Sequence, residues 1–204
     1  MEDFSQYAED FSLRLTGEND EINLHLSILF LELQDIYVAT YIFRVIDKEW
    51  DKRVYQEEVP NYSTVRAILY ESLVYRIILG LSKIFANQKE YSLLKATNQI
   101  EQIYKNDSGV KNVIDDIRQK INVSPMIPAI RMFRDKFFAH LDKENVLIHL
   151  RVDPTAAIKC IDCNEIEEWL SLINKLYEAC FNAELPRKTQ MPEKEDIIYT
   201  FFWR

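Results

Sequence analysis

The chain has 204 residues, of which 48% are hydrophobic, only 3 are glycine and 6 are proline, and its formal net charge is -8. This length fits one domain with a sizeable core. So few glycines argue against a fold rich in tight turns, and the motifs of glycine-rich phosphate-binding loops are missing. The acidic charge argues against a surface that coats nucleic acid along its whole length. Residues that favour helices recur throughout, and we expect an all-α protein.

Targeting and membrane signals are missing from the sequence. The first ten residues, MEDFSQYAED, are acidic and lack the basic start of a signal peptide. Charged residues interrupt the two longest apolar stretches, 27–46 and 67–85, so neither offers an uncharged run of about 18 residues. An odd number of cysteines, three, fits reduced thiols. We therefore expect a cytoplasmic protein that does not span a membrane.

The first helices follow from their capping residues. A helix over residues 2–15 is expected to end near Gly17. Asn19 or Asp20 can cap a second helix that continues to about residue 47 and is apolar on most of its surface. Such a helix belongs in the middle of a bundle. After the break at Pro60, Ser63 can cap a third long helix over residues 64–86.

Arg76 lies within the apolar stripe of this third helix. An unpaired buried charge is costly, so its guanidinium should have a partner. Glu32 and Asp35 on the preceding helix are the candidates. We interpret the group as an internal ion pair that fixes the register of two helices.

Shorter helices are predicted over residues 92–104, 110–121 and 128–142, followed by an extended piece at 145–153. Asp162 or Asn164 can cap a last long helix that ends near residue 183. The organisation we predict is one up-and-down helical bundle domain over residues 1–185. A short irregular C-terminal tail, residues 186–204, ends in the apolar sequence IIYTFFWR.

Metal and cofactor chemistry finds little support. Cys160 and Cys163 form a single CxxC, whereas a structural zinc site needs four ligands, usually from a second such pair. His25 lies in an apolar helix and reads as a hydrogen-bonded structural histidine. No Walker loop, GxGxxG, GxSxG or HExxH motif is present. We predict no metal site and no cofactor.

A local cluster of cations stands out against the acidic chain. Between residues 118 and 143, six cations outnumber two anions: Arg118, Lys120, Arg131, Arg134, Lys136 and Lys143 against Asp135 and Asp142. A small basic site on an acidic body suits the binding of one phosphate group. The plain alternative is a solvated helix face.

Within the cluster, Arg134 and His140 form a minimal set for cleaving RNA without a metal. Histidine can take and give a proton near pH 7, and arginine holds phosphate oxygens through a planar fork. The 2′-hydroxyl of RNA supplies the nucleophile, and DNA lacks it. Phe133 and Phe137 share the segment as core residues, so a surface histidine without a catalytic role remains an alternative.

The spacing of these two residues favours a dimer. Six residues separate them by about 9 Å along a helix and about 120° around it, which makes a loose site on one helix. Two such helices across a twofold axis would bring two arginines and two histidines into one cleft. Lys136 shares a face with His140 and can add charge, Asp135 can orient Arg134, and Arg131 can contact the RNA backbone.

The segment RDKFFAHLD, residues 134–142, resembles the signature of HEPN domains, in which an arginine and a polar residue precede a histidine. The chain is similar to the AbiU2-like branch of that superfamily. The similarity extends to AILYESLVYRIILGLSKIFAN, residues 67–87, and to IEEWLSLINKLYEA near the end of the chain. These pieces, in this order, span most of the chain.

The resemblance implies a dimeric helical bundle with metal-independent endoribonuclease activity, in toxin–antitoxin or phage-defence settings. It places Arg134 and His140 in the dimer cleft, with Asp135 as the polar neighbour, and implies an RNA substrate and an antitoxin protein as partner. One branch carries a modifiable tyrosine where this chain has Asp142, which argues against that modification here. Other members only bind, so the alternative is a non-catalytic dimer that recognises RNA or a protein. A third idea is a structural subunit that docks through its FFWR tail.

Overall fold

The computed structural model describes residues 20–55, 63–86, 91–138, 161–186 and 191–202. These residues form helices and no strand, which confirms the expected all-α fold. The helix expected at residues 2–15 and the extended piece at 145–153 lie outside the described residues. Seven helices are described: α2 (Asp20–Tyr55), α3 (Ser63–Ile84), α4 (Leu93–Ile103), α5 (Ser108–Val123), α6 (Met126–Phe138), α9 (Cys163–Phe181) and α10 (Lys194–Phe202).

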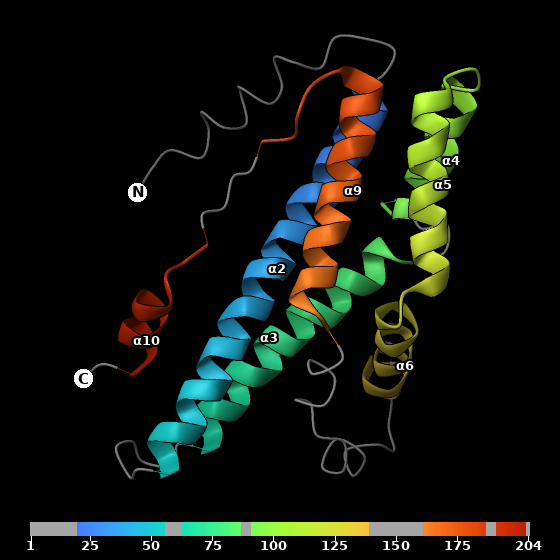
Figure 1. The fold of residues 1–204 in the computed structure, drawn as a ribbon. Helices are drawn as coiled ribbons and strands as arrows, with labels where there is room; N and C mark the ends of the chain where they lie inside the picture. Colours follow the sequence, from blue (N-terminus) through green and yellow to red (C-terminus); the bar gives the residue numbers. More distant parts are fainter. Residues whose placement is uncertain (1–19, 56–62, 87–90, 139–160, 187–190, 203–204) are drawn as a thin grey trace.

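The long helix α2 is the centre of the bundle (Figure 1). It contacts α3, α4, α9 and α10, and α9 lies beside it. The helix α5 packs against α9 and α4, while α6 packs against α3. The central place predicted for the second helix is therefore confirmed.

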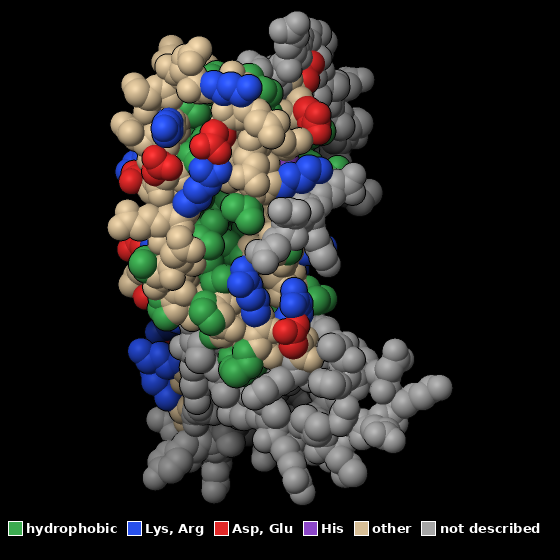
Figure 2. All heavy atoms as spheres, turned by 90° about the vertical axis from the view of Figure 1, so that its right-hand side faces the viewer, with side chains coloured by type: hydrophobic (Ala, Val, Ile, Leu, Met, Phe, Trp, Pro, Cys, Tyr) green, Lys and Arg blue, Asp and Glu red, His purple; other side chains and the backbone are tan. Residues whose placement is uncertain are grey.

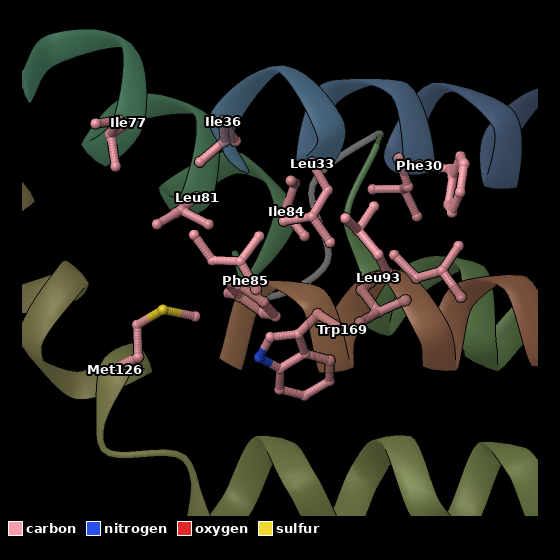
Figure 3. Packing of buried hydrophobic residues seen from close by; sticks show 14 of the residues in the cluster. Phe30, Leu33, Ile36, Ile77, Leu81, Ile84, Phe85, Leu93, Met126 and Trp169 are labelled. Atoms are coloured by element: carbon pink, nitrogen blue, oxygen red, sulfur yellow. The ribbon is translucent and has the colours of Figure 1, made fainter. Parts of the chain in front are cut away.

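A continuous hydrophobic core joins these helices (Figure 3). Trp169 of α9 is fully buried and its ring lies 5.0 Å from that of Phe85, at the end of α3. Leu33 of α2, Leu81 of α3 and Leu93 of α4 are also fully buried. Each such side chain contributes about 1.5–3 kcal/mol on burial, so the core is the main source of stability.

Capping residues set the helix boundaries, and for α9 the sequence suggested the cap. The Ser92 hydroxyl accepts a hydrogen bond from the backbone N–H of Lys95 at 3.3 Å and begins α4. Asp162, one of the two residues expected to cap the last helix, accepts from Asn164 N–H at 3.0 Å. At the other end of α9, Asn182 adopts a left-handed conformation with φ 51° that stops the helix.

By length and composition alone, the stretch Asp20–Glu49 of α2 is able to cross a membrane. However, 56% of its apolar window is buried inside the structure. A core helix that is apolar around most of its surface passes the same test. That the protein does not span a membrane therefore stays a prediction.

The ion pair predicted between the second and third helices is present. Arg76 Nη1 donates to Glu32 Oε1 at 2.7 Å, and Nη2 donates to Asp35 Oδ2 at 3.2 Å. The Arg76 side chain is 41% exposed, so the pair lies at the rim of the α2–α3 contact and not in the core. The pairing was predicted correctly. The burial of Arg76 was overestimated, because residues at the margin of an apolar helix stripe remain partly exposed to solvent.

The C-terminal tail differs from the irregular segment that was expected. Residues 194–202 form α10, which packs on α2 with Ile197 only 4% exposed. Lys194 Nζ lies 3.1 Å from Glu49 Oε1, and this hydrogen bond lowers the pKa of Glu49 despite its burial. The irregular tail was predicted from Pro186 and Pro192, which break helices. The signal for a helix was the acidic first turn followed by Ile197 and Ile198.

Candidate functional site

The candidate site lies on α6, whose sequence separates a buried face from an exposed one. Met126, Ile130 and Phe133 face inward, in a helical spacing, and the helix packs against α3. The helix begins at Met126, two residues before the predicted start. Pro128 is then its third residue, where a missing N–H still disrupts no intrahelical hydrogen bond.

Arg134 lies near the end of this helix and contacts its neighbour Asp135. Its Nε and Nη2 both donate to Asp135 Oδ1, at 2.8 and 2.6 Å. The two side chains are 37% and 60% exposed. An exposed pair of this kind is worth about 0–1 kcal/mol. A phosphate group can therefore replace the carboxylate on the guanidinium at small cost.

Arg131, one turn earlier, has a structural contact. Its Nη2 donates to the backbone oxygen of Phe85 at 3.4 Å, just beyond the last turn of α3. Cations are favourable near the carbonyl end of a helix. Arg131 is nevertheless exposed, so its contact with RNA remains a prediction.

Two other cations of the basic cluster are engaged by acidic side chains. Arg118 Nη2 lies 2.6 Å from Glu101 Oε2 of α4, and this contact lowers the pKa of Glu101. Lys120 pairs with Glu168 of α9 and its Nζ lies 5.2 Å from the centre of the Trp169 ring. These two cations connect α5 to neighbouring helices. Because their acidic partners offset their charge, the cluster is less positive at α5 than its residue count suggests.

The structure brings Arg131, Arg134 and Asp135 together on α6. Lys136 is in the last turn of the same helix, but its side chain is outside the described set. His140 also lies outside the described residues. The relative placement of Arg134 and His140 therefore stays a prediction.

The surface formed by α5 and α6 has mixed chemistry (Figure 2). Hydrophobic side chains gather in its middle, and Lys and Arg side chains lie around them together with Asp and Glu side chains. Val123, at the end of α5, is 70% exposed, and Met132 on α6 is 44% exposed. The face thus combines cations with apolar side chains next to the candidate site.

The remaining histidine and cysteine candidates behave as structural residues. His25 is 4% exposed, and its Nδ1 lies 3.3 Å from Gln99 Oε1, which confirms the expected hydrogen bond. Burial lowers the pKa of His25 and raises that of Cys163, while burial raises the pKa of Cys180 to about 12. Cys160 lies outside the described residues. Within the described part of the chain, no three metal-ligating side chains gather.

A family model named HEPN_AbiU2, with the description AbiU2, matches residues 21–195. The chain belongs to the HEPN_AbiU2 family. The match extends from the start of α2 into α10 and includes Arg134, Asp135 and His140. The comparisons with curated proteins and with solved structures found no match.

Membership in the HEPN_AbiU2 family confirms the resemblance that the segment RDKFFAHLD suggested. One contact at the start of α6 was not predicted. Ser124, just before α6, bonds Glu165 in the first turn of α9, 41 positions away. Neither residue is a charge within an apolar stripe, as Arg76 is, so no sequence signal indicated that the two would pair.

Proposed function

We propose that this HEPN_AbiU2 protein is a metal-independent endoribonuclease whose active site lies in a cleft between two copies of the chain. His140 moves protons and Arg134 stabilises the charge that develops on phosphate oxygens. One observation carries most of the support: in a chain of this family, Arg134 is a partly exposed cation held by an exposed, exchangeable carboxylate.

The proposed reaction uses the RNA as its own nucleophile. The 2′-oxygen attacks the adjacent phosphorus while an imidazole takes the 2′-hydroxyl proton. The bond between phosphorus and the 5′-oxygen breaks, and a second proton is delivered to that oxygen. The products are a 2′,3′-cyclic phosphate and a 5′-hydroxyl. Two copies of His140 in one cleft would let one imidazole take a proton while the other gives one.

The neighbouring side chains support this chemistry in the proposal. The scissile phosphate displaces Asp135 from Arg134, and the two freed N–H donors then hold two phosphate oxygens. Lys136 adds positive charge, and Arg131 contacts the RNA backbone next to the cleft. The protein would act in the cytoplasm as a toxin or phage-defence component, with an antitoxin protein as partner.

RNA cleavage by purified protein tests the proposal. A labelled single-stranded RNA and the DNA of the same sequence are incubated with wild type, His140→Ala and Arg134→Ala. Lys175→Ala, an exposed cation on α9, is the matched control. We expect RNA cleavage alone, unaffected by EDTA, with losses of about 10²–10⁴-fold in the two site variants. Circular dichroism checks that each variant is folded.

Three outcomes would contradict the proposal: His140→Ala cleaves like wild type, EDTA abolishes cleavage, or sedimentation shows a monomer at active concentrations. A wild type that binds RNA through Arg134 but never cleaves it would favour the non-catalytic alternative. Mixed dimers sharpen the test of the cleft. Combining His140→Ala with Arg134→Ala should restore part of the activity, because one cleft then retains one arginine and one histidine.

A further inference from the structure

The start of α6 is attached to α9 by a buried hydroxyl. Ser124 is 6% exposed, and its Oγ accepts a hydrogen bond from Ile127 N–H at 3.4 Å, as an N-cap does. The same hydroxyl donates to Glu165 Oε1 in the first turn of α9. The direction in which α6 leaves α5 is therefore tied to another helix.

Trp169 shares this attachment. Its Nε1–H donates to the same Glu165 oxygen at 3.4 Å, and its side chain is fully buried. One carboxylate oxygen thus accepts from both Ser124 and Trp169. A fully buried ring has little freedom to move, so Glu165 is itself held in place.

A second path leads from Trp169 to the middle of α6. The ring of Phe85 packs against the indole at 5.0 Å with an interplanar angle of 58°. The backbone oxygen of Phe85 in turn accepts from Arg131, three residues before Arg134. Phe85 and Trp169 lie against each other in the core, and Met126 of α6 belongs to the same cluster of buried side chains (Figure 3). The start of α6 is therefore connected to the Trp169 indole through Glu165, and Arg131 is connected to it through Phe85.

We infer that Ser124 and Glu165 are positioning residues that set the direction of α6 and thereby place Arg134 in the proposed site. Eight residues separate Met126 from Arg134, or about 12 Å of helix, so a tilt of about 5° moves Arg134 by about 1 Å. A misplacement of about 1 Å can reduce a reaction rate about 10²-fold. The catalytic consequence rests on the proposed function, whereas the attachment itself does not.

Hydrogen exchange and kinetics together test this inference. Ser124→Ala and Glu165→Ala each remove one side of the contact, and Ser171→Ala and Glu167→Ala are matched controls on the exposed face of α9. We expect amide exchange in residues 127–134 to become at least about tenfold faster in the first pair only. In the same pair, kcat for RNA should fall at least about tenfold while KM changes less than about threefold.

Conservative variants separate positioning from general damage. Ser124→Thr keeps the hydroxyl and Glu165→Gln keeps an accepting oxygen, so both should recover most of the lost kcat. Failure of these variants to recover it, when they are folded, would overturn the positioning role. If Ser124→Ala does not fold, Glu165→Ala carries the same comparison, because Glu165 is only partly buried.

The two proposals fail separately. Unchanged exchange in α6 of both alanine variants overturns the attachment, whatever the activity. Faster exchange with unchanged kcat overturns the positioning role and leaves the nuclease intact. A wild type that cleaves no RNA refutes the nuclease, and with it the catalytic half of this inference, while exchange still decides the attachment.

Discussion

Gly80 of α3 lies directly against Ile36 of α2. A Cβ at position 80 would come within 2.6 Å of Ile36 Cδ1 and 3.2 Å of Glu32 Oε1. Ile36 is fully buried, and Glu32 is the carboxylate that accepts from Arg76. Glycine therefore allows the two longest described helices to approach closely where the ion pair joins them.

We expect Gly80→Ala to destabilise the protein, although alanine favours helices. Overpacking a core costs about 1–3 kcal/mol, whereas the helix preference returns up to about 1 kcal/mol. The free energy of unfolding from urea titration should fall by about 1–2 kcal/mol. In an Ile36→Val background, which lacks Cδ1, the same substitution should cost at least about 1 kcal/mol less. Additive effects of the two substitutions would contradict the contact.

His25 should make stability depend on pH near neutrality. Burial lowers its pKa below the ordinary value of 6.5, with Lys95 acting in the same direction and Gln99 and Glu21 opposing it. The unfolded chain then binds more protons than the folded one just below pH 6.5. The contribution of neutral His25 is complete above pH 6.5 and is lost as the pH falls from there through the lowered folded pKa.

The measurement is the urea midpoint between pH 7.5 and 5. Wild type should lose stability as the pH falls, and His25→Gln should show a flatter profile because the titrating group is gone. The carboxylates of Glu49 and Glu101, with lowered pKa values, act only below their ordinary value of 4.5 and leave this window clear. Parallel profiles for wild type and His25→Gln would refute the assignment.

Cys180 should react very slowly with alkylating reagents in the folded protein. Burial raises its pKa to about 12, mainly by disfavouring the thiolate. Since only the thiolate is reactive, alkylation at pH 8 should be roughly a thousandfold slower than for an ordinary exposed thiol. Mass spectrometry after iodoacetamide treatment, with and without urea, reads the modification at each cysteine. Rapid labelling of Cys180 before unfolding would contradict the burial.

Local signals in the sequence predicted much of the fold. Ser92 and Asp162 marked helix starts correctly, and the spacing around Arg76 led to its partners on the preceding helix. The helix starts depend on neighbouring residues, whereas the Arg76 pair was predicted because a charge within an apolar stripe requires an acidic partner on an adjacent helix. The end of α2 was placed too early because the charged residues after Asp47 continue the helix without a capping signal.

Long-range features escaped the sequence analysis for a physical reason. The docking of α10 on α2 and the contact of Ser124 with Glu165 depend on how distant segments pack, and no periodicity records this. At the candidate site, residue types indicated Arg134 and His140. They did not reveal that Arg118 and Lys120 serve helix contacts, since their acidic partners lie on α4 and α9.

The contact of Tyr177 with Asn23 joins residues 154 positions apart, and α9 covers the apolar side of α2. A ribosome makes α2 before α9, so α2 emerges well before the helix that covers it. During that interval its apolar surface is open to chaperones and to other nascent chains. We therefore expect aggregation to occur mainly during synthesis, while α2 is still uncovered, and less in the folded protein.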